Sequence, residues 1–302
     1  MDENVLKSPL PMVDGVGSSR QWLPVGPWET VLSFLDERFP YVRSDTWLAR
    51  MEKGEVVDET GLRLSAKSRY RVGACIFYYR ELQSEKVIPF DERIIYQDEH
   101  ILVVDKPHFL PVIPAGRFLH ETLLVRLKKQ GRPEALVPIH RLDRETAGVV
   151  LFSQNPKTRG QYVSLFQQRR VKKVYEALAC TSSPALSLPA TRRSRIVAGE
   201  PFFRMKEIPG APNSETYIDV VRQMGDATLY QLHPVTGRKH QIRLHLSALG
   251  IPIVNDKLYP AITVVENDDF SMPLKLLAKS VSFQDPLNGQ ERYFESGRTL
   301  VV

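Results

Sequence analysis

The sequence predicts an α+β protein in which a small module precedes a larger domain with a mixed, mostly antiparallel sheet and a central cleft. Two observations predict this class. In the second part of the chain, short alternating or apolar runs typical of strands outnumber helical runs. Successive runs are joined by short turns, such as the one at Gly225, which favour antiparallel pairing. Polar loops between the runs are expected to line the cleft.

The chain is expected to divide into three parts. Residues 1–26 are rich in Pro, Gly and Ser without periodicity, and should form a mostly irregular arm. Residues 27–82 should form the small module and residues 88–302 the large domain, with a polar linker between them. A chain of 302 residues can build a core in both.

The small module begins with two predicted helices. Apolar residues recur at helical spacing from Trp28 to Phe39, where Pro40 ends the pattern. A second helix is expected after Ser44 as its cap, with Gly54 as its terminator. Two strand-like runs follow, at residues 55–57 and 74–79, with a turn at residues 59–61.

The large domain is predicted to be richer in strands than in helices. Two strands around an acidic turn are expected within residues 94–107, and others at residues 149–152, 172–179, 215–221, 228–232 and 274–283. Helices are expected over residues 119–130, after Asn155, and from Thr236 as cap to Leu249. The stretch 181–213 is expected to form a loop and a hairpin that rim the cleft.

The composition is that of an ordinary globular protein, with 42% hydrophobic and 25% charged residues. The net charge of +6 is uneven, because cations cluster at residues 169–173 and 192–195; such clusters suit a phosphate backbone or a solvated face. The two cysteines, Cys75 and Cys180, lie in apolar segments and lack metal-ligand spacing, which favours buried thiols in a reducing compartment over a disulfide or a zinc site. No apolar run suggests a membrane span or signal peptide, so the expected location is the cytoplasm.

One polar stretch stands out, His140-Arg141-Leu142-Asp143-Arg144-Glu145-Thr146-Ala147-Gly148, followed by the apolar run 149–152. A carboxylate between two arginines, leading into a buried strand, is how an active-site loop is usually mounted. The stretch resembles the signature loop of the RluA-type pseudouridine synthases. Only Ala147 departs, where that family more often has Ser.

The resemblance implies an enzyme that isomerises uridine in structured RNA to pseudouridine, with Asp143 as nucleophile. Isomerisation breaks the bond from the sugar to nitrogen, turns the base and rejoins it through carbon. A carboxylate can attack the sugar, or remove a proton to form a glycal, and later leave. Neither a metal nor a redox cofactor is expected. Ribosomal or transfer RNA is the expected partner, the target base must be flipped out, and a monomer is expected.

Further segments resemble the same family, in family order. Lys173-Val174-Tyr175-Glu176-Ala177 resembles its second motif, which implies that Tyr175 stacks on the target base. Residues 236–246 resemble its third motif, with Lys239 as the deviation, which implies that Arg238 pairs with Asp143 and orients it. Two other segments, 98–107 with its Lys-Pro and 250–256 with Asn255 in place of Gly, also match. His240 and His245 are expected to make hydrogen bonds within the scaffold rather than to bind a metal.

RNA is expected to contact a set of cations. Arg141 is expected, by resemblance, to fill the space left by the flipped base, because a guanidinium can stack. The small module resembles a degenerate copy of a small RNA-binding domain first described in a ribosomal small-subunit protein. The full set of expected RNA contacts is Arg141, Arg144, Lys106, Arg169, Arg170, Lys172, Lys173 and Lys239.

Two other classes of function remain open. An aspartate-dependent hydrolase of nucleoside or RNA glycosidic bonds would usually need a second carboxylate, for which Glu145 is the nearby candidate. A catalytically silent RNA-binding protein is expected to have lost its nucleophile, but Asp143 is present. The RNA target and the modified position cannot be read from the sequence.

Overall fold

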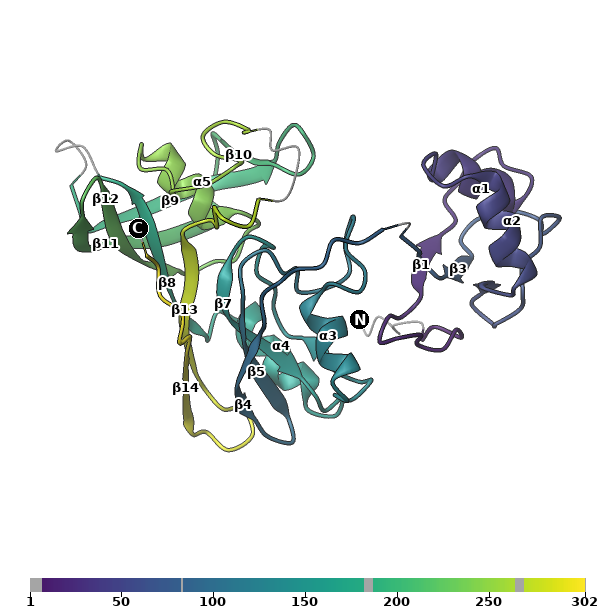
Figure 1. Cartoon of the computed structure of the whole chain (residues 1–302), viewed down its shortest axis with the longest axis horizontal. Helices are drawn as coiled ribbons and strands as arrows, with labels where there is room; N and C mark the ends of the chain where they lie inside the picture. Colours follow the sequence, from purple (N-terminus) through teal and green to yellow (C-terminus); the bar gives the residue numbers. More distant parts are fainter. Residues whose placement is uncertain (1–6, 83, 182–186, 264–268, 302) are drawn as a thin grey trace. The chain divides into compact units, whose positions relative to one another are not determined.

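The computed structural model describes residues 7–82, 84–181, 187–263 and 269–301, so part of the expected loop at 181–213 lies outside it. The chain forms two compact units (Figure 1). The first contains residues 1–85 and 114–120, and the second contains residues 86–113 and 121–302. No helix in the described ranges has the length and apolar character needed to cross a membrane.

The first unit packs two helices against a three-stranded antiparallel sheet. Thr30 caps the first helix and forms a capping box with Ser33, which explains where that helix starts. The strand order is β1-β3-β2. The expected arm is therefore only partly irregular, because part of it forms the edge strand β1. The elements are β1 (Ser19–Trp22), α1 (Val31–Arg38), α2 (Ser44–Glu52), β2 (Val56–Asp58) and β3 (Cys75–Tyr78).

The second unit is built on one large sheet, whose order along the main path is β10-β9-β11-β12-β8-β13-β7-β5-β4. Of its described pairings, that between β13 and β7 is parallel and the others are antiparallel, as the sequence predicted. Its strands are β4 (Arg93–Gln97), β5 (Ile101–Lys106), β6 (Val137–Pro138), β7 (Ala147–Ser153), β8 (Lys172–Cys180), β9 (Ala190–Ala198), β10 (Met205–Ile208), β11 (Ser214–Met224), β12 (Ala227–Pro234), β13 (Leu276–Gln284) and β14 (Glu291–Glu295).

The described helices of this unit are α3 (Leu123–Lys129), α4 (Arg159–Gln167) and α5 (Gln241–Ala248). Tyr162 and Leu165 of α4 pack with apolar residues of β5, β7 and β13. Ile242 and Leu246 of α5 pack with apolar residues of β8, β11 and β12. α4 and α5 thus cover different halves of the sheet, and β13 lies between the halves (Figure 1).

Local differences from the sequence expectations concern helix starts. The helix expected to have Thr236 as its N-cap has His240 as its N-cap instead, in the left-handed conformation at φ 55°, and it begins at Gln241. The helix expected directly after Asn155 begins at Arg159.

Two other local expectations are confirmed. Asn255 adopts φ 63°, so the turn expected to tolerate Asn in place of Gly is present. The expected hairpin is formed by β9 and β10.

Gly148 is required where β7 meets β13. Its φ is 114°, a conformation that side-chain-bearing residues rarely adopt. A Cβ built there would lie 2.1 Å from the carbonyl oxygen of Ala278 on β13, and backbone cannot easily move away. We expect Gly148→Ala to lower the free energy of unfolding by about 3 kcal/mol through strain and overpacking. Urea unfolding would measure the change, and a loss below about 0.5 kcal/mol would contradict the assignment.

Candidate active site

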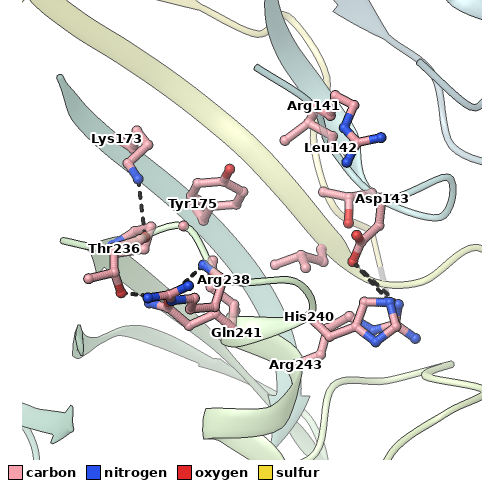
Figure 2. Close-up of a pocket in the computed structure, with 15 residues that line it drawn as sticks. Arg141, Leu142, Asp143, Lys173, Tyr175, Thr236, Arg238, His240, Gln241 and Arg243 are labelled. Atoms are coloured by element: carbon pink, nitrogen blue, oxygen red, sulfur yellow. Dashed lines mark hydrogen bonds and ion pairs between the residues drawn. The ribbon is translucent and has the colours of Figure 1, made fainter. Parts of the chain in front are cut away.

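A pocket opens where three segments meet: the loop before β7, the strand β8 and the turn leading into α5 (Figure 2). The pocket therefore brings together residues from all three expected motifs. Its lining includes Asp143, Tyr175 and Arg238, the three residues expected to be catalytic. The other lining residues are Arg141, Leu142, Thr146, Lys173, Pro234, Thr236, Gly237, His240, Gln241, Ile242, Arg243 and Leu276.

Asp143 lies on the loop that enters β7. The amide of Thr146 donates a hydrogen bond to the carbonyl of Asp143 at 3.1 Å, which closes a tight turn before the buried strand. The side chain of Asp143 remains 29% exposed, so its carboxylate can be reached from the pocket. A reachable carboxylate on an anchored turn can act as a nucleophile or a base.

The cation beside Asp143 is Arg243, not Arg238. The guanidinium of Arg243 lies 3.5 Å from Asp143 Oδ2 and makes two hydrogen bonds, of 2.8 and 2.7 Å, to the carboxylate of Asp256. Its side chain is 3% exposed. Burial alone would lower the pKa of Arg243, but the hydrogen bonds and charge of Asp256, with the charge of Asp143, raise it above the ordinary value. Arg243 is thus a permanent, fixed cation.

The expectation that Arg238 pairs with Asp143 is wrong in this structure. Arg238 is exposed on the turn before α5, and its Nε donates to the carbonyl of Asn213 at 3.3 Å. The cause is the late start of the helix: Arg238 precedes it, whereas Arg243 lies in its first turn. A cation between Ile242 and Leu244 was the signal in the sequence, because a charge among buried apolar residues needs a partner.

Gln241 holds the turn that precedes α5. Its side-chain oxygen accepts hydrogen bonds from the Thr236 hydroxyl at 2.6 Å and from the Arg238 amide at 3.1 Å. Its side-chain nitrogen donates to the Glu215 carbonyl and the Thr216 hydroxyl, each at 2.9 Å. Gln241 is buried, so these bonds fix the backbone that forms one wall of the pocket.

Tyr175 forms the floor of the pocket from β8. It packs against the core cluster under α5, while its ring remains part of the pocket lining (Figure 2). Burial and then the charge of Asp143 raise the pKa of Tyr175 well above its ordinary value, so the phenol stays protonated at neutral pH. A neutral, fixed aromatic ring suits the stacking role expected for it.

His240 lies near the same carboxylate oxygen of Asp143 as Arg243 does, and it contacts the Tyr259 hydroxyl (Figure 2). Its Nδ1 lies 3.0 Å from the Tyr259 hydroxyl, and its Nε2 lies 3.8 Å from Asp143 Oδ2. Burial lowers the pKa of His240 to about 4, although Asp143 acts in the opposite direction, so the ring is neutral near pH 7. His245 is fully buried and bonds to Thr216, Ser194 and Ser214. Both histidines make the expected scaffold hydrogen bonds.

Lys106 cannot contact RNA as expected, because its side chain is fully buried. Its ammonium donates to the carbonyls of Pro107, Leu110 and Arg144, at 3.0, 2.7 and 3.1 Å. Arg144 follows Asp143 directly, so this hydrogen bond from Lys106 stabilises the loop that carries Asp143. Burial lowers the pKa of Lys106 to about 7, against the charges of Glu145 and Asp143 that raise it.

Lys106→Met is expected to lower the free energy of unfolding by about 1–3 kcal/mol, because buried carbonyls lose their donor. The loss should grow with pH. Folding lowers the pKa of Lys106 from about 10.4 to about 7; between these values the unfolded chain binds more protons, so wild-type stability gains from rising pH. Urea unfolding of both proteins at pH 6.5 and 9 checks this. A difference that shrinks at pH 9 would contradict it.

The remaining expected RNA contacts fall into two groups. Arg144 pairs with Glu145 at 2.5 Å, and both side chains are only about one-fifth exposed. Lys173 is partly buried in the pocket. The exposed cations, which stay candidate contacts for a phosphate backbone, are Arg141, Arg169, Arg170, Lys172 and Lys239.

A model of the family described as RNA pseudouridylate synthase matches residues 100–248. The chain is also similar to an uncharacterized RNA pseudouridine synthase, slr1592, of Synechocystis, with 28% identity over 76% of this chain and 79% of that protein. It is 34% identical to the dual-specificity RNA pseudouridine synthase RluA of Vibrio vulnificus, over 64% of this chain and 78% of that protein.

The fold is similar as well. Human RNA Pseudouridylate Synthase Domain Containing 1 aligns with a TM-score of 0.57 and 25% identity, over 69% of this chain and 84% of that chain. The matched segment 100–248 contains the loop of Asp143, the strand of Tyr175 and the first turns of α5. The similarity therefore extends over the three segments that supply the lining residues of the pocket other than Leu276.

Proposed function

The chain belongs to the RluA-type family of RNA pseudouridine synthases, and from this premise we propose that Asp143 is the nucleophile that acts on uridine in RNA. As a member of this family it isomerises uridine to pseudouridine. The observation that supports the assignment of Asp143 is its position: it is a reachable carboxylate 3.5 Å from a buried cation, in the pocket that also contains Tyr175.

In the proposed reaction the target uridine leaves its stack and its base enters the pocket against Tyr175. Flipping the base out costs a few kcal/mol. Contacts between exposed cations of the protein and RNA phosphates offset this cost. Arg141 lies exposed at the pocket mouth, where its guanidinium can occupy the space that the base leaves. These roles are supported by position and exposure.

The bond between N1 and C1′ then breaks and its electron pair stays on the uracil. Asp143 either forms a bond to C1′ or takes the proton from C2′. Arg243 keeps the carboxylate oriented in either case. After the base turns, C5 bonds to C1′; at the same time the bond from Asp143 to C1′ breaks or, in the glycal route, the proton returns from Asp143 to C2′. C5 then loses its proton and N1 gains one, so the atoms and charges balance.

The hydrolase alternative is not favoured by the arrangement of carboxylates. Glu145 is not among the residues lining the pocket, and its side chain is paired with Arg144. A general base for water would have to face the sugar. Within the described part of the pocket, Asp143 is the carboxylate that does so.

The RNA target is proposed to be a structured ribosomal or transfer RNA. The test is to map pseudouridines in total RNA from cells with and without the gene. At least one position should lose its pseudouridine without the gene, and the wild-type gene, unlike the Asp143→Asn gene, should restore it. Identical maps, or release of free uracil by the purified protein, would overturn the proposal.

A further inference from the structure

A cation without a counter-charge lies inside the pocket. The ammonium of Lys173 donates one hydrogen bond, to the carbonyl of Thr236 at 3.2 Å, and forms no ion pair with any residue that the structure describes. Removing a charged lysine from water costs free energy when no acidic side chain lies beside it. Such a group is a candidate for binding an electron-rich ligand atom.

The surroundings of Lys173 leave the pocket as the place for that ligand. Arg169 is close enough to repel it, and His140 nearby is neutral because burial lowers its pKa to about 3. His140 also accepts a hydrogen bond from the Leu151 amide at 3.1 Å, which uses its Nε2. Gly237 leaves space beside the ammonium, since even a Cβ there would lie 3.9 Å away.

Lys173 and Tyr175 are two positions apart on β8, so their side chains leave the same face of the sheet. They are about 6.5 Å apart along the strand. A ring stacked on Tyr175 can therefore present its edge to the ammonium. Figure 2 shows Tyr175 between Lys173 and Asp143 in the view drawn, so the sugar side of the nucleotide would face Asp143.

Resting on the proposed function, we propose that Lys173 is a catalytic residue whose ammonium binds a carbonyl oxygen of the target uracil and stabilises the base while it is detached. When the bond between N1 and C1′ breaks, the uracil keeps the electron pair and its negative charge spreads over N1, O2 and O4. A fixed cation at one of these oxygens stabilises the detached anion more than the bound base, and this difference accelerates the step.

A phosphate group would also attract Lys173, but the observations favour the base. With the base in the pocket, the phosphates of a bound RNA would stay outside it, where the exposed Arg169, Arg170 and Lys172 are available. Lys173 differs from these cations in being partly buried and next to the stacking ring. The two ligands predict different kinetics, because a phosphate contact strengthens substrate binding, whereas an oxygen of the leaving base contributes mainly to the chemical step.

The test compares Lys173→Met with wild type in single turnover, with enzyme in excess over total RNA from cells lacking the gene. Met has similar length but no charge. The rate of pseudouridine formation at saturating enzyme should fall about 100- to 1,000-fold, as when one preorganised donor is removed, while RNA affinity changes less than about threefold. Lys157→Met, an exposed lysine outside the pocket, is the matched control and should keep the wild-type rate.

The dependence of kcat/KM on pH distinguishes a catalytic role of Lys173 from a merely structural one. Burial and then the charge of Arg169 lower the pKa of Lys173 to about 8. Wild-type kcat/KM, which reports the free enzyme, should therefore fall as pH rises through about 8. Lys173→Met should lack this fall, and Lys173→Arg should shift it to higher pH and recover part of the rate.

The outcomes separate the possibilities. Weaker RNA binding with an unchanged saturating rate would show a phosphate contact and overturn the inference, as would an unaltered pH profile in Lys173→Met. If circular dichroism shows that Lys173→Met does not fold, Lys173→Gln takes its place with the same expected loss. A wild-type enzyme that forms no pseudouridine would overturn the proposed function, and this inference with it; an active wild type with a fully active Lys173→Met overturns the inference alone.

Discussion

Asp143→Asn is expected to abolish pseudouridine formation, with a loss of about 10,000-fold or more, as for other essential nucleophiles. Asn has the same shape but neither attacks C1′ nor accepts a proton from C2′. Asp143 is partly exposed on a turn fixed by its backbone, so the fold should be retained. The measurement is single-turnover pseudouridine formation, with circular dichroism to confirm folding.

Glu145→Gln is the control for this experiment. Glu145 is a carboxylate of the same loop, but its side chain pairs with Arg144 and does not line the pocket. We expect only a small effect on the rate. If Glu145→Gln were as inactive as Asp143→Asn, the hydrolase chemistry with two carboxylates would become the better explanation.

The second large effect is expected for Arg243→Gln. This change leaves the carboxylate of Asp256, which is 1% exposed, without its cation and removes the cation beside Asp143. Breaking a buried ion pair from one side costs about 3–5 kcal/mol. We expect a loss of this size in urea unfolding, together with a large loss of activity measured below the unfolding transition.

Arg238→Gln distinguishes this assignment from the one expected from the motif. Arg238 is exposed, so its replacement should change the free energy of unfolding by less than about 0.5 kcal/mol. Its activity should fall less than that of Arg243→Gln. The reverse order of activities would show that Arg238 orients the nucleophile.

Much of the fold could be predicted because the local patterns agree with the tertiary structure. The alternating strands of the large domain and the turn at Asn255 have residue types that suit only a few conformations. The strand β1 could not be predicted, because its edge position depends on pairing with β3, which is more than fifty residues away. The start of α5 was predicted too early, because Thr236 is a residue type that can cap a helix. In the structure its hydroxyl instead donates a hydrogen bond to the side chain of Gln241.

The sequence could predict which residues form the candidate site, but not which of them contact one another. The motifs identified Asp143 and Tyr175, which the structure brings into one pocket. The partner of Asp143 depended on where α5 starts: its N-cap is His240 instead of Thr236, so Arg243 and not Arg238 lies beside Asp143. The burial of Lys106 likewise depends on the loop that folds over it, which no local pattern describes.

The position of β13 has a consequence for how the enzyme is made. β13 pairs with β7 on one side and β8 on the other, so it joins the strand after Asp143 to the strand of Tyr175 and Lys173. The sheet therefore cannot join the strand after Asp143 to the strand of Tyr175 and Lys173 during translation until β13, which ends at Gln284, has left the exit tunnel. A nascent chain should therefore lack the complete sheet that carries the site for most of its synthesis, since long-range closure comes last.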